Sequence, residues 1–258
     1  MCRIAGIVDH SNPPSEQQIQ LMTTAMRRGG PDDAGIYSDE QWPLVFGHRR
    51  LSLLDLSPLG HQPMQSQSGN IVLIFNGEIY NFQSIKAELV TKGYSFISHS
   101  DTEVIIYAYQ EWGIECFKRF NGMFALALLD KAAGKLFLAR DHAGIKPLYY
   151  SISKGRLIFA SEIRAFKALE PNWEENSDWK KYFLLFGHLP EPITTLTNVQ
   201  PLAKGTVLEV DLDTLSTKQH SFFQLYYNYT IQDTSAAVIA LQQTLTDSVE
   251  RHLISDAP

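Results

Sequence analysis

The sequence predicts a layered α+β domain rather than a parallel sheet built from alternating strands and helices. Many short strand-like segments are joined by hairpin signals, and the few helix-like segments are collected between them instead of alternating with them one for one. With 258 residues and 44% hydrophobic content, the chain can also bury a sizeable core. No internal repeat or low-complexity segment interrupts this pattern.

The first half of the chain contains predicted strands at residues 3–8, 34–38, 44–48 and 70–75. A capping-box pattern at 15–18 predicts a helix that must stop at the Gly-Gly-Pro sequence of residues 29–31. Asn81 and Asp101 are the predicted N-caps of two further helices, the first of which ends at Gly93. The strands therefore come in a cluster before the second helix.

The second half contains predicted strand pairs at residues 123–129 with 135–140, 148–152 with 156–160, and near 207–223. Gly134 and the Lys154-Gly155 pair mark the first two turns, and a helix is expected around Trp179. Residues 235–253 have a helical apolar stripe made of Val238, Leu241, Leu245 and Val249. Because this pattern runs into the end of the sequence, we expect that the stripe packs on a part of the protein beyond residue 258 and that the sequence stops at a domain boundary.

The composition argues against nucleic acid and membrane partners. The 22 Lys and Arg residues are outnumbered by 28 Asp and Glu residues, the net charge is -6, and no basic run is interleaved with aromatic residues. The apolar runs are too short for a signal peptide or a membrane span, which predicts a cytoplasmic location. The two cysteines are accordingly expected to be reduced thiols.

Cys2 is the first candidate for chemistry. Aminopeptidases remove an initiator methionine when the next side chain is small, and removal here would leave a thiol and a free α-amine on one residue. An α-amine has a reference pKa of about 7.7–8.0, so a good share is neutral near neutral pH and can accept the thiol proton. Position alone favours the plainer alternative, in which Cys2 is an accident of a short N-terminal strand.

Three polar clusters supply what acyl transfer from a side-chain amide such as that of glutamine needs. Arg50 could hold an α-carboxylate through two hydrogen bonds, or be an ordinary surface arginine. Asn76 and Gly77 follow an apolar strand and could form an oxyanion hole, or only an Asn-Gly hairpin turn. Asp101 could accept from an α-ammonium group, or only cap a helix.

Other titratable residues give no sign of a metal or nucleotide site. Cys116 lies among aromatic and apolar neighbours, which assigns it to the core. The eight histidines show no His-x-x-x-His arrangement, and neither a Gly-x-x-x-x-Gly-Lys loop nor a Gly-x-Gly-x-x-Gly sequence occurs. We therefore expect no metal site and no cofactor in this chain.

Several sequence motifs, taken in order and spacing, carry a resemblance to a known family. They are Met-Cys-Arg-Ile-Ala-Gly-Ile at 1–7, Gly-Pro-Asp-Asp at 30–33, Gly-His-Arg-Arg-Leu-Ser at 47–52, Phe-Asn-Gly-Glu-Ile-Tyr-Asn at 75–81, Ser-Asp-Thr-Glu-Val at 100–104, Asn-Gly-Met-Phe-Ala at 121–125, Arg-Asp-His-Ala-Gly-Ile-Lys-Pro-Leu-Tyr-Tyr at 140–150 and Phe-Ala-Ser-Glu at 159–162. The chain thereby resembles the N-terminal domain of glutamine-hydrolysing asparagine synthetases. The resemblance implies a class II glutamine amidotransferase with a four-layer αββα N-terminal-nucleophile hydrolase fold containing two antiparallel β-sheets.

The resemblance also implies a role for each candidate residue. Cys2 is the nucleophile with its amine as the base, and Asn76 with the Gly77 N–H forms the oxyanion hole. The implied glutamine-binding residues are Arg50 for the α-carboxylate, Glu78 and Asp101 for the α-amino end, and Leu51 to Leu54 as the pocket wall. Attack of the thiolate on the side-chain amide would release ammonia and leave a γ-glutamyl thioester for water to hydrolyse.

The same resemblance sets the expected domains and partners. Residues 1–210 correspond to the glutaminase domain, and 211–258 to a connecting strand and the start of a synthetase domain, before its Ser-Gly-Gly-x-Asp-Ser pyrophosphatase loop. ATP and Mg²⁺ would belong to that missing domain alone. The expected partners are L-glutamine, the C-terminal synthetase domain of the same protein and a second copy in a homodimer.

One departure and three alternatives accompany this interpretation. The family usually has His-Arg-Gly-Pro-Asp where this chain has Arg28-Gly29-Gly30-Pro31-Asp32, so Gly29 replaces an arginine connected with the glutamine loop or the ammonia exit. The acceptor could differ from aspartate, as in surface polysaccharide pathways. The chain could instead resemble amidotransferases that make glucosamine 6-phosphate or phosphoribosylamine, or it could be a catalytically silent regulatory module.

Overall fold

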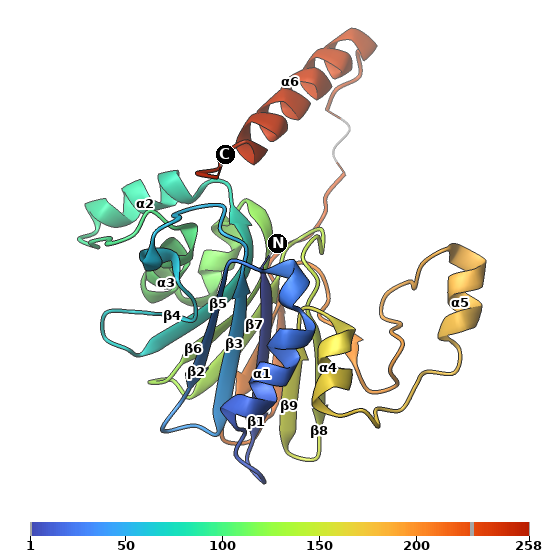
Figure 1. The fold of residues 1–258 in the computed structure, drawn as a ribbon. Helices are drawn as coiled ribbons and strands as arrows, with labels where there is room; N and C mark the ends of the chain where they lie inside the picture. Colours follow the sequence, from blue (N-terminus) through green and yellow to red (C-terminus); the bar gives the residue numbers. More distant parts are fainter. Residues whose placement is uncertain (1, 228–229, 258) are drawn as a thin grey trace.

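Two facing antiparallel sheets with helices on their outer sides form the body of the protein (Figure 1). The computed structural model describes residues 2–227 and 230–257. One six-stranded sheet, sheet A, has the order β10-β8-β9-β1-β3-β2, and the other, sheet B, has the order β12-β11-β7-β6-β5-β4. The predicted αββα layering is therefore confirmed.

The chain builds the two sheets in alternating blocks of strands: β1 to β3 in sheet A, β4 to β7 in sheet B, β8 to β10 in sheet A, and β11 and β12 in sheet B. Sheet A contains β1 (Arg3–Asp9), β2 (Asp33–Ser38), β3 (Leu44–Arg50), β8 (Tyr149–Ser153), β9 (Arg156–Ala160) and β10 (Gln200–Pro201). Sheet B contains β4 (Met64–Gln65), β5 (Ile71–Ile79), β6 (Gly122–Asp130), β7 (Lys135–Arg140), β11 (Thr206–Asp211) and β12 (Thr217–Ser221). The α-helices are α1 (Glu16–Ala25), α2 (Phe82–Thr91), α3 (Asp101–Trp112), α4 (Ile163–Leu169), α5 (Trp179–Phe186) and α6 (Thr234–His252), and short 3-10 helices lie at Arg27–Gly29, Pro58–Gly60 and Gly113–Arg119.

Three apolar layers hold these elements together. Helices α1 and α4 cover sheet A, and α2 and α3 cover sheet B, while a central layer fills the space between the sheets. Strand β1 shows why its sequence is apolar throughout: Ile4 and Val8 face the central layer, whereas Ala5 and Ile7 face α1 and α4. A strand that is buried on both faces reads as a continuous hydrophobic run.

The predicted helix starts are partly confirmed. Ser15 and Gln18 form the expected capping box of α1. The prediction that Asp101 is the N-cap of α3 is wrong. Ser100 takes that position, and its hydroxyl accepts from the Thr102 N–H at 3.1 Å. This frees the Asp101 carboxylate from capping, and its Oδ2 instead accepts from the Ile79 N–H at 2.9 Å.

The N-cap prediction for Asn81 is also only half right. Asn81 occupies the N-cap position of α2, but its side chain makes no capping hydrogen bond. Its amide instead donates to the Arg119 carbonyl at 2.9 Å and accepts from the Asn121 N–H at 2.9 Å. A tertiary contact has therefore replaced the local one.

The predicted end of the strand at Phe75 is wrong, and so is the hairpin alternative for Asn76-Gly77. Strand β5 continues to Ile79, with Asn76 opposite Ala125 and Gly77 opposite Phe124 on β6. Long-range pairing to β6 thus overrides the local turn signal of an Asn-Gly pair.

The predicted hairpins of the second half are confirmed. Gly134 lies between β6 and β7, Lys154-Gly155 joins β8 to β9, and all three of these residues have positive φ. Strand β12 pairs with β11 at the edge of sheet B. The predicted domain boundary between residues 210 and 211 lies at the end of β11 and stays a prediction.

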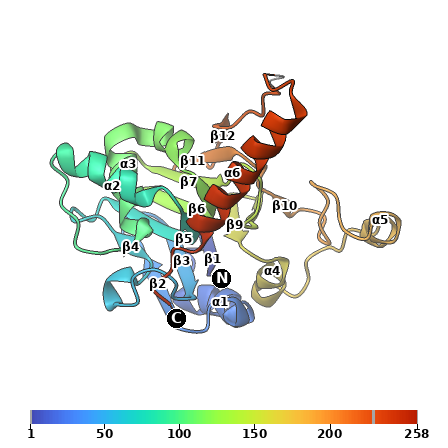
Figure 2. The same ribbon diagram turned by 90° about the horizontal axis from the view of Figure 1, so that it is seen from above.

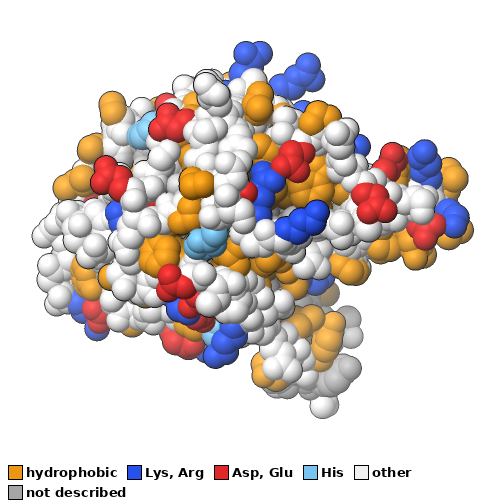
Figure 3. Space-filling view, turned by 90° about the horizontal axis from the view of Figure 1, so that it is seen from below, with side chains coloured by type: hydrophobic (Ala, Val, Ile, Leu, Met, Phe, Trp, Pro, Cys, Tyr) orange, Lys and Arg blue, Asp and Glu red, His pale blue; other side chains and the backbone are white. Residues whose placement is uncertain are grey.

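Helices α5 and α6 stand apart from the two-sheet body (Figures 1 and 2). Four consecutive large apolar side chains of α5, Phe183 to Phe186, are exposed, and hydrophobic atoms gather on this projection (Figure 3). The predicted stripe of α6 is exposed as well, with Leu241 60% accessible. Within residues 2–227 and 230–257, no helix combines the length and apolar character needed to cross a membrane.

Candidate active site

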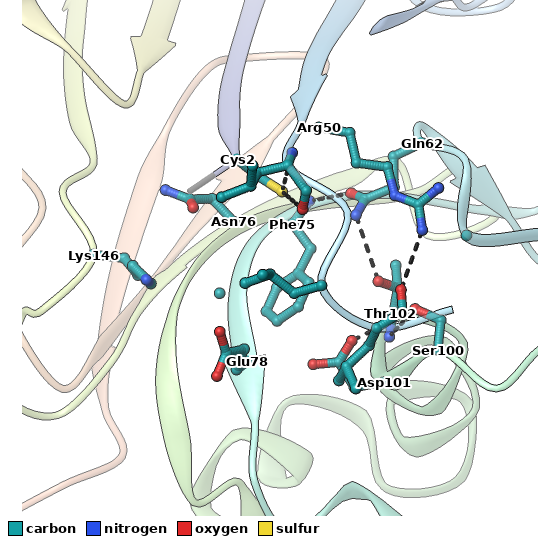
Figure 4. A pocket seen from close by; sticks show the side chains of 15 residues that line it. Cys2, Arg50, Gln62, Phe75, Asn76, Glu78, Ser100, Asp101, Thr102 and Lys146 are labelled. Atoms are coloured by element: carbon teal, nitrogen blue, oxygen red, sulfur yellow. Dashed lines mark hydrogen bonds between the residues drawn. The ribbon is translucent and has the colours of Figure 1, made fainter. Parts of the chain in front are cut away.

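The structure brings all eight predicted site residues to one pocket at the ends of the sheets (Figure 4). They come from five places: the residue before β1, the last residue of β3, the loop after it, the middle of β5 and the first turn of α3. In that order, the residues are Cys2; Arg50; Leu51 and Leu54; Asn76, Gly77 and Glu78; and Asp101. Segments that are far apart in sequence thus meet at a single site.

Cys2 lies at the pocket with its sulfur against the backbone of Leu51. The Leu51 N–H points at Sγ with a separation of 3.4 Å, and the thiol can donate to the Leu51 carbonyl at 3.5 Å. Burial raises the pKa of the Cys2 thiol, while the Leu51 N–H and the nearby Arg50 charge oppose that increase. The resting thiol is therefore neutral and needs a base before it can attack. The predicted removal of Met1 concerns a residue outside the described part of the chain.

Arg50 is a buried cation held in place by backbone carbonyls. Its guanidinium donates to the carbonyls of Ser57 at 3.4 Å, Leu54 at 3.2 Å and Asp55. Because these partners are neutral, they orient the guanidinium without cancelling its charge. The pocket therefore offers a fixed positive charge that suits a carboxylate.

Asn76 and Gly77, which belong to β5, lie next to Cys2 in the pocket. Asn76 is 0% exposed, and neither its Nδ2 nor its Oδ1 has a hydrogen-bond partner among the described residues. A buried amide without partners is costly, so this side chain is poised for a group that the pocket receives. A Cβ at Gly77 would come 2.2 Å from the Met123 carbonyl oxygen, which explains why β6 allows only glycine there.

Glu78 and Asp101 give the pocket two carboxyl groups. Burial, with a further contribution from Glu78, raises the pKa of Asp101 to about 7, against the opposing effect of the Ile79 N–H. Burial also raises the pKa of Glu78, and the positive charge of Lys146 opposes this. Two acids of this kind hold a proton easily when no cation is near and release it when a cation arrives.

Lys146 was not predicted to belong to the site, although it lies in one of the motifs of the resemblance. Its side chain lines the pocket, is 1% exposed, and lies on the side of Asn76 and Glu78 in Figure 4. Burial lowers the pKa of Lys146, and the charge of Glu78 opposes this effect. The turn that presents it is held by Asp141, which accepts from the Lys146 N–H at 3.0 Å.

Gln62 is a second lining residue that sequence reasoning missed. Its Oε1 accepts from the Phe75 N–H at 2.7 Å, and its Nε2 donates to the Thr102 hydroxyl at 3.4 Å. It thus ties β5 to the start of α3 across the pocket floor. No motif marks Gln62, because its role depends on a contact between separate segments.

The replacement of the family arginine by Gly29 has a structural counterpart outside the pocket lining. A Cβ at Gly29 would lie 2.5 Å from Cζ of Arg3. Arg3, which forms an ion pair with Glu162, therefore fills the space beside Gly29 with its own guanidinium. The Arg3 side chain of β1 thus lies directly against Gly29 of the 3-10 helix.

Two facing antiparallel sheets between helical layers are the architecture of the N-terminal-nucleophile hydrolase fold class. A solved structure supports this fold: glutamine phosphoribosylpyrophosphate amidotransferase from Bacillus subtilis superimposes with a TM-score of 0.67 at 18% identity, over 87% of this chain and 50% of that one. Within this class, the chain belongs to the glutamine amidotransferase domain family, whose model matches residues 1–223. The chain is thus a glutamine amidotransferase domain.

Several curated relatives that match nearly the whole chain are named asparagine synthetases. Asparagine synthetase (glutamine-hydrolysing) 2 of Bacillus subtilis is 36% identical over 274 residues, which cover 99% of this chain and 36% of that protein. Asparagine synthetase (glutamine-hydrolysing) 1 of the same organism is 31% identical over 262 residues, covering 100% of this chain and 41% of that protein. The predicted resemblance is confirmed, and the chain spans about half or less of the length of the curated relatives that it matches.

Proposed function

We propose that this domain hydrolyses L-glutamine to glutamate and ammonia through a γ-glutamyl thioester on Cys2. The observation that carries the proposal is the buried, unpartnered amide of Asn76 beside the Cys2 thiol, in a pocket that also presents Arg50. A nucleophile, a donor without a partner and a cation for a carboxylate are what acyl transfer from an amino-acid amide requires.

Substrate binding uses the two ends of the pocket. The α-carboxylate of glutamine pairs with Arg50, and the α-ammonium group pairs with Asp101 and Glu78. Arrival of the ammonium lowers the pKa of Asp101, so the carboxyl group loses its proton as glutamine binds. Leu51 and Leu54 pack along the methylene groups of the substrate.

The chemical steps need no cofactor. The free α-amine of Cys2 takes the thiol proton, and the thiolate attacks the side-chain amide carbon. The Asn76 Nδ2–H and the Gly77 N–H stabilise the oxyanion, and the C–N bond breaks as the protonated amine returns its proton to the leaving nitrogen. Water then attacks the thioester, which releases glutamate and restores the thiol.

In the longer protein, the ammonia would serve ATP-dependent synthesis of asparagine from aspartate. This extension rests on the asparagine synthetases that match the whole chain. ATP and Mg²⁺ would bind to the synthetase domain, and the protein would work in the cytoplasm as a homodimer. The acceptor is the part of the proposal that depends on residues outside this chain.

The test is release of ammonia and glutamate from L-glutamine by protein whose first residue is verified as Cys2. We expect Cys2→Ala to abolish release and Cys116→Ala, which replaces a thiol in the core, to retain it. Protein that keeps Met1 should be inactive because its Cys2 nitrogen is an amide. Equal release by the Cys2→Ala variant, or none by correctly processed protein, would favour the silent regulatory module instead.

A further inference from the structure

The loop that follows β3 orients the cation of the pocket. The carbonyls of Leu54 and Asp55 accept hydrogen bonds from one terminal nitrogen of Arg50, and Leu51, Leu53 and Leu54 line the pocket. Any shift of this loop therefore moves the guanidinium. The contacts that fix this loop therefore also fix the position of the Arg50 guanidinium in the pocket.

The segment after α6 forms hydrogen bonds with the same loop. The Asp256 N–H donates to the Leu53 carbonyl at 2.8 Å, and the Asp256 Oδ2 accepts from the Asp55 N–H at 2.7 Å. Asp256 thus fixes both ends of the stretch from Leu53 to Asp55, in which the carbonyls of Leu54 and Asp55 accept from Arg50. From Asp256 to the guanidinium there is a single intervening residue, Asp55.

Asp55 has a conformation that needs such support. Its φ is 51°, in the left-handed region that non-glycine residues rarely adopt. Its carboxylate accepts from the Ser57 N–H in the loop at 3.1 Å and from the His99 N–H, in the segment before α3, at 2.9 Å, so the side chain already has partners. The Asp55 N–H is left to Asp256.

The end of α6 also contacts the residue that follows β5. The ring of His252, the last residue of α6, packs against the ring of Tyr80 with centroids 4.3 Å apart. Tyr80 directly follows β5, which carries Asn76 and Gly77. The helix end and the segment after it therefore contact the loop that follows β3 and the residue that follows β5, and Figure 1 shows the helix descending to this edge of the body.

We propose that Asp256 is a positioning residue for glutamine binding, which acts through Asp55 on Arg50 and so couples the placement of α6 to the affinity of the pocket. This inference rests on the proposed binding of the glutamine α-carboxylate by Arg50. Asp256 is exposed and is not among the residues that line the pocket, so its effect is transmitted through the loop that it holds.

The experiment compares Asp256→Ala, Asp256→Asn and Asp247→Ala in the full chain, by hydrolysis kinetics and by L-glutamine binding to the Cys2→Ala forms. Asp256→Ala should raise KM and the dissociation constant about fivefold, the effect of one hydrogen bond, with kcat unchanged. Asp256→Asn should restore both because its amide oxygen still accepts from the Asp55 N–H. Asp247→Ala removes the same charge from α6. Among the described residues, the Asp247 carboxylate accepts a hydrogen bond only from the Gln243 side chain, so this variant should change neither KM nor the dissociation constant.

The inference is overturned if Asp256→Ala binds glutamine as the parent does, if Asp256→Asn fails to restore binding, or if Asp247→Ala weakens binding equally. Loss of kcat without a change in KM would also overturn it. Failure of the proposed function looks different, because parent protein would then hydrolyse glutamine no faster than Cys2→Ala. Absence of glutamine binding in the Cys2→Ala protein would overturn the assignment of the pocket and this inference together.

Discussion

The pocket wall at Asn76 and the turn that begins at Asp141 treat buried polar side chains in opposite ways. Both side chains are 0% exposed. Asp141 accepts hydrogen bonds from the N–H groups of Phe124, Ala143, Ile145 and Lys146 at 2.9 to 3.1 Å, whereas Asn76 has no partner among the described residues. A satisfied group stabilises the fold, and an unsatisfied one is kept at a cost for the sake of a ligand.

Replacing Asn76 by alanine should produce the largest loss of activity. The oxyanion loses its side-chain donor, so kcat for glutamine hydrolysis should fall by about 10²–10³-fold. The free energy of unfolding should change by less than about 1 kcal/mol, because no hydrogen bond is lost in the empty pocket. Steady-state kinetics together with urea unfolding measure both quantities. An Asn76→Ala protein that is fully active, or strongly destabilised, would remove the contrast with Asp141.

Replacing Asp141 by alanine should produce the largest loss of stability. Four buried N–H groups lose an ionised acceptor, and we expect the free energy of unfolding to fall by about 3–5 kcal/mol. Urea unfolding is the measurement, with Asp213→Ala at an exposed turn as the control that should change by less than about 0.5 kcal/mol. Similar values for the two variants would show that the turn does not depend on its central carboxylate.

Asp101 stands between these two cases, since it is buried, partly hydrogen-bonded and titratable. Its pKa of about 7 means that the carboxyl group becomes protonated as the pH falls below 7, and a protonated group cannot pair with an ammonium. The KM for glutamine should therefore rise by up to about tenfold for each pH unit below 7. Kinetics between pH 5.5 and 8 test this, and a flat KM over that range would contradict it.

The same pKa has a consequence for stability. Because it is raised, the folded protein holds a proton that the unfolded chain releases near its ordinary pKa of 3.8, so ionisation of Asp101 costs stability as the pH rises from about 4 to 7. Asp101→Asn should remove that loss, so the stability of the variant relative to the parent should be higher at pH 8 than at pH 5. Thermal unfolding at both pH values shows whether the difference has this sign.

The smallest expected effect concerns Gly60, which borders Arg50 from the far side. A Cβ at Gly60 would lie 2.0 Å from Nη2 of Arg50 and 2.8 Å from the Asp55 carbonyl oxygen. Gly60→Ala should push the guanidinium off its carbonyl partners and raise KM about threefold to fivefold, with kcat preserved. Gly69→Ala brings no atom within 4 Å of its Cβ, although its φ of 72° strains the backbone, and it serves as the control for a glycine replacement away from the pocket. Equal KM values for the two variants would mean that Arg50 adapts freely.

Local sequence signals predicted the parts of the fold that depend on neighbours in the chain. The capping box at Ser15 and the hairpin at Gly134 were correct because a few adjacent residues decide them. The Asn-Gly pair at Asn76 was read as following the strand, and Asp101 as a cap, because pairing with β6 and contact with Ile79 involve distant residues. Tertiary contacts outweigh such local preferences.

The candidate site divides along the same line. Cys2, Arg50, Asn76, Gly77 and Asp101 could be singled out as candidates from the residues themselves. Glu78, Leu51 and Leu54 came only from the resemblance, and the structure gathers all eight at one pocket. Gln62 escaped because its importance lies in two hydrogen bonds to β5 and α3, neither of which has a sequence signature. Lys146 was visible in a motif, but only the turn centred on Asp141 shows that its charge is brought into the pocket.

The position of β1 within sheet A also bears on how the protein matures during synthesis. β1 pairs on one side with β3 and on the other with β9, and Arg3 is anchored by Glu162. At ribosomal rates of about 5–20 residues per second, β9 emerges roughly 10–30 seconds after the N-terminus. The first strand of the chain therefore pairs with its second neighbour only after this interval. Under the proposed mechanism, which requires the free amine of Cys2, a peptidase can remove Met1 before β9 is available to complete the sheet.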